Sequence, residues 1–147
     1  TVSEDEIAAA ILALIEKQKL IAEGAGATPV AAAIFNKLPI QGKKVACLVS
    51  GGNIDVTILS RVIKRGLLMS GRNHTLCIEL MDKPGQLQDV SAIIASLGAN
   101  VISVHHERAS ETMDINGCYL RIVLETRNFE HIEQITKALT EAGFKLC

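Results

Sequence analysis

Residues 44–53 decide the fold of the first half of the chain, and they read KVACLVSGGN. Residues 44–49 are a short apolar run with β-branched members, which predicts a strand covered on both faces, as in a parallel sheet. Residues 54–67 then carry apolar side chains on one side and basic side chains on the other, which predicts an amphipathic helix. Asn53 is the predicted N-cap of this helix, and Ser50 is the alternative cap.

The turn between this strand and this helix contains Ser50, Gly51 and Gly52. Open α/β sheets hold ligands where a glycine-rich turn follows the carboxyl end of a parallel strand and opens a helix. The alternative is a tight turn that needs glycine for its backbone alone. Because one strand cannot pair its own edges or bury both of its faces, residues 44–49 are expected to need partner strands outside this chain or in another copy of it.

Two helices are predicted before this strand. Ser3 and Glu6 form an S-x-x-E capping box ahead of an apolar series, which predicts a helix start. Residues 23–27 are rich in glycine and predict a break in helical structure. After this break, Thr28 is the expected cap of a second helix and Pro29 its first residue.

Residues 71–147 alternate between strand and helix patterns. Apolar residues at period two predict strands that begin near residues 76, 102, 118 and 144, and helical periodicity predicts helices over residues 87–97 and 132–139. Asn116-Gly117 marks a hairpin turn between the middle strands. The order βαββαβ is the ferredoxin-like arrangement. The chain is therefore predicted to be α+β, with an α/β segment at residues 1–70 and a ferredoxin-like domain at residues 71–147.

Three motifs in the first half carry a family resemblance: residues 2–7 (VSEDEI), 23–27 (EGAGA) and 50–55 (SGGNID). Their order and spacing resembles the C-terminal end of the catalytic domain of the threonine dehydratase (threonine ammonia-lyase) family, pyridoxal-phosphate enzymes of fold type II. Serine racemase is similar here. From about Arg72 onward the chain resembles an ACT regulatory domain, so the resemblance covers essentially the whole chain.

The resemblance implies roles for four residues. The hydroxyl of Ser50 is expected to hydrogen-bond the pyridine nitrogen of pyridoxal phosphate, and Gly51 and Gly52 to let the backbone approach the ring. Glu23 is expected to border the same cleft, the alternative being a solvated carboxylate with no role. The implied reaction of the intact parent converts threonine to 2-oxobutanoate and ammonia.

The chain lacks the Ser-x-Lys-x-Arg-Gly segment that supplies the Schiff-base lysine in this family, and it lacks the glycine-rich phosphate loop. It is therefore expected to be a C-terminal fragment of a lyase, with no catalytic residue, no bound cofactor and no activity of its own. Two alternatives stand beside this hypothesis. One is a stand-alone amino-acid-binding regulatory module, and the other is a different fold type II serine/threonine lyase or racemase.

Residues 82–87 read DKPGQL between a predicted strand and a predicted helix. Exposed N–H groups at such a helix start suit a carboxylate, and ACT domains carry a similar D-x-P-G-x-L loop that often binds amino acids between paired domains. The resemblance implies isoleucine or valine as the effector and a homo-oligomer formed through the ACT domains. The alternative is a helix start with no ligand. The expected contacts are Asp82, Pro84, Gly85, Gln86 and Leu87 of one copy, with Asn100 and Val101 of a neighbouring copy.

Composition narrows the partners and the compartment. The formal net charge is −1, which gives no electrostatic attraction to nucleic acid or to an anionic membrane. The four cysteines are widely spaced and none forms a C-x-x-C pair, so free thiols in a reducing cytoplasm are expected, with Cys47 and Cys118 buried in strands. His105 and His106 are adjacent on a predicted strand and point to opposite faces, so no metal site is expected.

Overall fold

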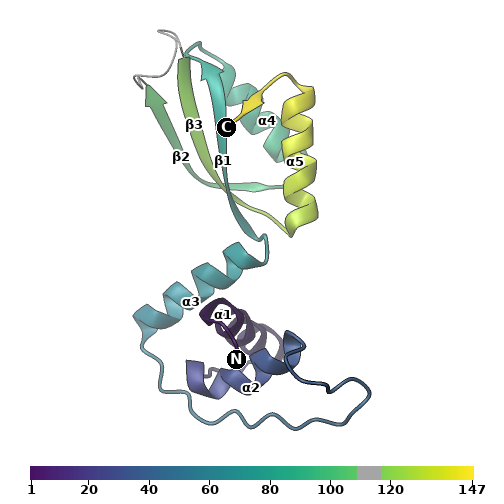
Figure 1. The fold of residues 1–147 in the computed structure, drawn as a ribbon. Helices are drawn as coiled ribbons and strands as arrows, with labels where there is room; N and C mark the ends of the chain where they lie inside the picture. Colours follow the sequence, from purple (N-terminus) through teal and green to yellow (C-terminus); the bar gives the residue numbers. More distant parts are fainter. Residues whose placement is uncertain (109–116) are drawn as a thin grey trace. The chain divides into compact units, whose positions relative to one another are not determined.

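The computed structural model describes residues 1–108 and 117–147, which fold as two compact units, Thr1–Met69 and Ser70–Cys147 (Figure 1). The predicted turn at Asn116-Gly117 begins outside the described residues. Among the described residues, no helix has both the length and the apolar character that crossing a membrane requires.

The first unit begins with α1 (Glu4–Ala13), and its predicted capping box is confirmed. The Ser3 Oγ accepts a hydrogen bond from the Glu6 N–H at 3.2 Å, and the Glu6 carboxylate accepts one from the Ser3 N–H at 2.8 Å. The helix continues as a π-helical turn, η1 (Leu14–Gln18), and ends at Lys19, whose φ is 58°. Side chains of α1 and η1, above all the fully buried Ile11, form the centre of a small core.

The second helix, α2 (Gly24–Ile34), starts four residues before the predicted cap, so the predicted break at residues 23–27 is wrong. Glu23 occupies the N-cap position, and Pro29 lies inside the helix. Proline removes only one backbone hydrogen bond at this place, and the Thr28 hydroxyl adds another by donating to the Gly24 carbonyl at 2.9 Å. The buried Ala27 and Ala31 pack on the core of the unit. This burial favours the helix despite the glycines that predicted a break.

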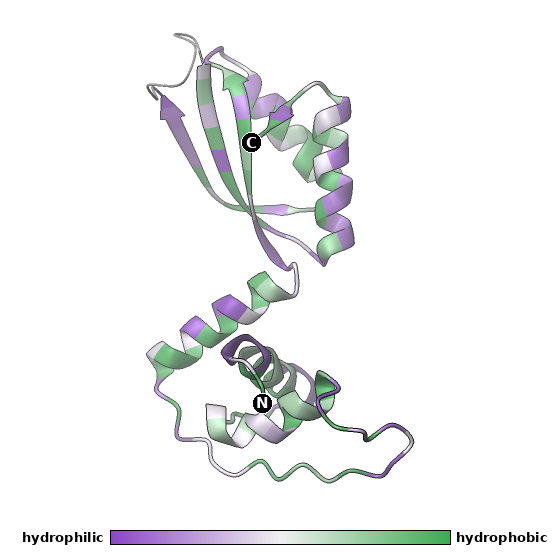
Figure 2. Ribbon diagram, in the orientation of Figure 1, coloured by the Kyte–Doolittle hydropathy of each residue, from purple (hydrophilic) through white to green (hydrophobic). Residues whose placement is uncertain are grey.

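Residues 44–49 form no strand, contrary to the prediction. Most of this run is exposed, with the Leu48 side chain at 80% and Cys47 also exposed, and Figure 2 shows apolar residues along this extended segment. A strand exists only when a neighbouring strand pairs with it, and Thr1–Met69 contains none. Val49 and Ile54 do reach the core, and they hold the two ends of the glycine turn against it.

The third helix, α3 (Val56–Met69), is capped by Asp55 and not by the predicted Asn53 or Ser50. One carboxylate oxygen of Asp55 accepts hydrogen bonds from the N–H groups of Thr57 at 2.7 Å and Ile58 at 3.4 Å. The helix packs closely on α1, where a Cβ at Gly66 would lie 2.9 Å from Leu12 Cδ2. Arg65 also makes two hydrogen bonds to the carboxylate of Asp5, at 2.6 and 2.9 Å.

The second unit has the predicted βαββαβ order. Its strands form one antiparallel sheet in the order β2-β3-β1-β4, and Figure 1 shows α4 and α5 on one side of this sheet. The elements are β1 (Asn73–Met81), α4 (Gln86–Ser96), β2 (Asn100–Arg108), β3 (Gly117–Glu125), α5 (Phe129–Glu141) and β4 (Lys145–Leu146). The predicted ferredoxin-like architecture is confirmed.

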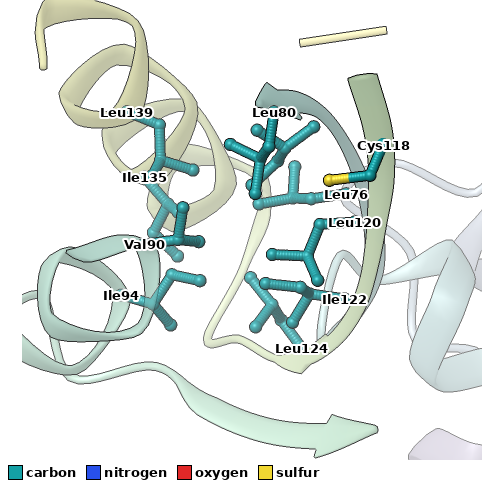
Figure 3. Close-up of a cluster of buried hydrophobic side chains, with 11 residues drawn as sticks. Leu76, Leu80, Val90, Ile94, Cys118, Leu120, Ile122, Leu124, Ile135 and Leu139 are labelled. Atoms are coloured by element: carbon teal, nitrogen blue, oxygen red, sulfur yellow. The ribbon is translucent and has the colours of Figure 1, made fainter. Parts of the chain in front are cut away.

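Alternate residues of β1 and β3 face the two helices and make the core of this unit (Figure 3). Apolar residues at period two on the strands and at helical spacing on α4 and α5 place all these side chains on the inner side. Ile78, Ile94, Ile122 and Ile135 are fully buried. The edge strand β2 differs, because its apolar side chains Ile102 and Val104 remain 54% and 39% exposed.

Two of the cysteine predictions are wrong. Cys77 of β1 and Cys147 after β4 form a disulfide, with their Cα atoms 5.3 Å apart. The backbone N–H of Cys147 donates to the Cys77 carbonyl, and this pairing brings the last residue of the chain beside β1. Cys47 is free but exposed, because the strand expected to bury it does not form, whereas Cys118 is free and buried as predicted.

Candidate functional site

A cavity of about 400 Å³ lies in the second unit where β1 passes into α4, and its volume is typical of a small-molecule site. The predicted D-x-P-G-x-L loop forms one wall of this cavity. The opposite wall comes from β2 and β3, and consists of His106, Arg108, Cys118 and Leu120. The structure thus places Asp82, Pro84, Gly85, Gln86 and Leu87 around one cavity.

Strand register brings these walls together. Arg108 lies opposite Cys118, and Cys118 lies opposite Leu80. His106 occupies the next such row, opposite Leu120. Residues directly opposite one another on adjacent strands point to the same face of a sheet, so His106 and Arg108 share the face that carries the helices. The sequence did not indicate that Arg108, His106 or Cys118 belongs to this site.

The charged groups of the cavity centre on Asp82. Its Oδ2 lies 2.9 Å from Arg108 Nε, and its Oδ1 lies 3.9 Å from His106 Nε2. About a third of the Asp82 side chain and 70% of the Arg108 side chain are exposed, so this ion pair adds little to stability. It does hold the carboxylate in a defined place at the rim, with one oxygen turned toward His106.

The start of α4 supplies hydrogen-bond donors to the same cavity. Gly85 precedes the helix with a φ of 95°, and among the described residues no side chain caps the helix. The first N–H groups of a helix have no partner within it, and the helix dipole makes this end favourable for anions. Leu87, 44% exposed, adds an apolar side chain beside these donors. The cavity therefore combines N–H groups of a kind that suits an anion with a carboxylate and an apolar contact.

Cys118 forms the buried floor of the cavity, with only 1% of the residue exposed. Burial raises the pKa of its thiol, the charge of Asp82 raises it further, and the charge of Arg108 partly offsets both effects. The thiol therefore stays protonated at neutral pH unless a cation replaces its proton.

Asn100 and Val101 lie at the far end of β2 from this cavity. They are paired with Glu125 and Leu124, and the Asn100 side chain donates to the Glu125 carboxylate at 3.3 Å. Within one copy the structure therefore does not bring them to the 82–87 loop. Their assignment to the site of a neighbouring copy concerns an assembly and stays a prediction.

In the first unit, the structure brings Glu23 and the Ser50-Gly51-Gly52 turn side by side. The Glu23 N–H donates to the Gly51 carbonyl at 3.2 Å. A Cβ at Gly51 would lie 2.8 Å from Glu23 Oε1, and a Cβ at Gly52 would lie 3.0 Å from the Ile21 carbonyl oxygen. Two motifs that are separate in the sequence thus meet in space, and glycine lets their backbones approach.

Ser50 is exposed at this meeting point. It does not cap α3, because Asp55 does, and within the described part of the chain its hydroxyl has no hydrogen-bond partner. Among the alternatives for Ser50, the helix-capping role is thereby excluded. The hydroxyl is available to a ligand that approaches the turn.

Comparison with known proteins gives a domain match for the second unit and relatives for nearly the whole chain. The ACT domain model matches residues 74–144. The chain is 46% identical to the L-threonine ammonia-lyase of Thermotoga maritima over 99% of its own length, and 43% identical to that of Geobacter sulfurreducens over 97%. It is 32% identical to a biosynthetic L-threonine dehydratase of Halalkalibacterium halodurans over 98%.

The chain spans only 36% of the length of the first two relatives and 34% of the third. Because the ACT model matches residues 74–144, these residues are an ACT domain. Nearly the whole chain is homologous to part of the L-threonine ammonia-lyases (threonine dehydratases).

Proposed function

We propose that this chain is the C-terminal part of a pyridoxal-phosphate-dependent threonine dehydratase of the cytoplasm, which converts threonine to 2-oxobutanoate and ammonia. The observation that carries the proposal is the similarity to threonine ammonia-lyases across both units, at 46% identity over 99% of the chain. In this proposal residues 1–70 complete the catalytic domain and residues 71–147 regulate it. The 147 residues alone, which lack the family's lysine segment, have no lyase activity.

The residues of the first unit fit one side of a cofactor site. Ser50 offers an exposed hydroxyl, and Gly51 and Gly52 let the turn lie close against Glu23 and Ile21, where a Cβ would come within 2.8 and 3.0 Å of their oxygen atoms. We infer that the Ser50 hydroxyl holds the ring nitrogen of pyridoxal phosphate and that Glu23 orders the turn. The cofactor supplies an electron sink when it is bound, and a neutral hydroxyl partner keeps that sink weaker than a carboxylate would.

We further propose that the cavity of the ACT domain binds a branched-chain amino acid, isoleucine or valine, as an allosteric effector. The N–H groups at the start of α4 suit its carboxylate, and Asp82 suits its ammonium group. Leu87 is placed to contact the aliphatic side chain. Isoleucine is favoured over valine by analogy, because the proposed reaction would supply its precursor.

The effector site is proposed to be completed by a second copy, whose Asn100 and Val101 approach the cavity. Strand β2 supports an association of this kind, because it is an edge strand with exposed apolar residues. Such an edge invites pairing with another chain. Sedimentation of the chain at micromolar concentration is expected to show a dimer or larger assembly, and a clean monomer would contradict the proposal.

Calorimetry of the full chain in metal-free buffer tests the effector site. Isoleucine or valine is expected to bind, and Asp82→Ala is expected to weaken that binding about tenfold or more, because a charged hydrogen bond is worth about 1.5–3 kcal/mol. Glu107→Ala is the matched control. It also removes one carboxylate, but from the face of the sheet opposite the cavity, where Glu107 of β2 pairs with Arg121 at 3.2 Å. Absence of heat, or equal affinity in Asp82→Ala, would refute the effector proposal.

A further inference from the structure

Three potential metal ligands from three separate segments converge in the cavity of the ACT domain. Asp82 follows β1, His106 lies on β2, and Cys118 lies on β3. One ligand atom from each of them lies within 4.8 Å of the other two. Figure 3 shows Cys118 at the end of β3 beside Leu80, the end at which β1 passes into the Asp82 loop.

This combination of donor atoms suits zinc. Zinc in proteins is bound by thiolate sulfur, imidazole nitrogen and carboxylate oxygen, with bond lengths of about 2.0–2.3 Å. Tetrahedral geometry then places ligand atoms about 3.2–3.7 Å apart. The separation of 3.9 Å between His106 Nε2 and Asp82 Oδ1 is close to this range. Both side chains are more than a third exposed. Small rotations of these side chains can therefore bring the three ligand atoms to the separations that zinc requires.

We propose that Asp82, His106 and Cys118 bind one zinc ion, with a fourth coordination position open toward the cavity. Three protein ligands and one exchangeable position are the arrangement of zinc sites that bind small molecules. Binding replaces the proton of the Cys118 thiol with the metal, and that proton passes to solvent. The open position faces the same space of about 400 Å³ that the uncapped end of α4 lines.

Arg108 affects metal binding in two opposite ways: it orients Asp82, and its positive charge disfavours a cation. Its Nε holds Oδ2 of Asp82 at 2.9 Å, which leaves Oδ1 directed at His106. Hydrogen bonds of this kind orient the carboxylate ligands of protein-bound metals. The positive charge of Arg108 opposes a second cation nearby. Because 70% of its side chain is exposed, Arg108 is free to turn toward solvent when the metal enters.

The proposal departs from the expectation that this chain has no metal site. That expectation considered His105 and His106 as a pair, and the structure agrees that they point to opposite faces, His105 opposite Arg121 and His106 opposite Leu120. The partners of His106 come instead from the loop after β1 and from β3. They are brought beside it only by the strand register.

Metal binding is a separate question from effector binding, although both concern one cavity. Asp82 belongs to both proposed sites. The zinc site also needs His106 and Cys118, whereas the effector site needs the α4 N–H groups and neither His106 nor Cys118. Titration with metal alone, without any amino acid, therefore tests the zinc proposal by itself. Calorimetry in metal-free buffer tests the effector proposal by itself.

Cobalt substitution in the full chain is the decisive experiment. Titration with Co²⁺ alone is expected to give the intense visible bands of a tetrahedral ion and a near-ultraviolet thiolate-to-cobalt band, both saturating at one equivalent per chain. Zn²⁺ is expected to abolish both bands. Cys118→Ser is expected to remove the thiolate band, and His106→Ala to weaken Zn²⁺ binding at least tenfold in equilibrium dialysis.

Two matched controls separate this site from adventitious binding. His105→Ala removes the neighbouring histidine on the other face, and Cys47→Ser removes the exposed free thiol of the first unit; both are expected to bind cobalt and zinc as the unaltered chain does. His106→Ala changes a partly exposed residue and keeps the test valid if Cys118→Ser fails to fold. Absence of the thiolate band, its persistence in Cys118→Ser, or equal zinc affinity in His106→Ala and His105→Ala would overturn the proposal.

Discussion

Gly26 shows how a single residue positions the candidate cofactor site. It is buried in α2, and a Cβ there would lie 3.0 Å from the carbonyl oxygens of both Ser50 and Gly51. Gly24 of the same helix has more room, because its Cβ would meet only Ile7 Cγ2 at 3.7 Å. The backbone of the Ser50 turn therefore approaches the start of α2 at Gly26, where no side chain fits without displacing that turn.

Gly26→Ala is predicted to destabilise the chain by about 1–3 kcal/mol, the usual cost of overpacking. Gly24→Ala, the control, is predicted to be neutral or to stabilise it by up to about 1 kcal/mol, because alanine is the better helix former. Urea unfolding followed by circular dichroism measures both changes. A stabilising Gly26→Ala would show that the turn does not lie against α2 as described.

Asp55 gives the first unit a pH dependence. The backbone N–H groups of Thr57 and then Ile58 hold the pKa of its carboxyl below the ordinary value. A lowered folded-state pKa stabilises the fold fully above the unfolded-state pKa, and this stabilisation is lost as the pH falls through the lowered value. Asp55→Asn is therefore predicted to lose less stability than the unaltered chain as the pH falls below about 4.

Thermal unfolding from pH 7 to pH 2 measures this difference. The control Asn53→Asp places a carboxylate at the position that the sequence predicted as the cap. It is expected to leave the acid dependence of the unaltered chain nearly unchanged, because Asp55, and not residue 53, caps α3 in the described structure. Identical acid profiles for Asp55→Asn and the unaltered chain would contradict the assignment of the cap.

At the scale of elements, local patterns predicted each helix and strand that the structure describes in the second unit. Each of its strands has a partner within the unit, so alternation in the sequence becomes pairing in the structure. Residues 44–49 have an equally strong strand pattern, but no partner lies within Thr1–Met69, and they stay extended and exposed. The sequence pattern shows only that a segment favours an extended backbone. Whether a strand forms depends on pairing with a neighbouring strand.

The disulfide between Cys77 and Cys147 joins β4 to β1 and closes a loop over a sequence separation of 70. Cysteine spacing alone did not reveal it, because the two residues meet only through the sheet register. The chain-entropy estimate for such a loop is about 4 kcal/mol. Cys147→Ser is predicted to lower the unfolding midpoint of the oxidised chain, as is reduction by dithiothreitol.

Guanidinium unfolding with and without dithiothreitol checks this prediction. The reductant is expected to destabilise the unaltered chain and to have no further effect on Cys147→Ser. Cys47→Ser is the control, because Cys47 is exposed and unpaired in the described structure. An unaltered chain that is insensitive to the reductant would show that the two thiols stay free.

At the scale of the whole molecule, the sequence located one wall of the ACT-domain cavity and missed the other. The glycines and proline of residues 82–87 marked a loop that opens a helix, because turn chemistry is local. His106, Arg108 and Cys118 reach the same cavity only through the pairing of β2, β3 and β1. The pairing of Arg108 with Cys118 is a property of the observed register of β2 and β3, and the sequence carries no equally clear signal for it.

The central claim is that this chain supplies the effector-binding part of a threonine dehydratase. The most direct test is the rate of 2-oxobutanoate formation from threonine by the full-length protein as isoleucine is titrated. The account predicts threonine turnover whose rate changes with isoleucine and saturates, and a response that is weakened in Asp82→Ala. No 2-oxobutanoate from threonine, or a rate that neither isoleucine nor valine alters, would contradict it.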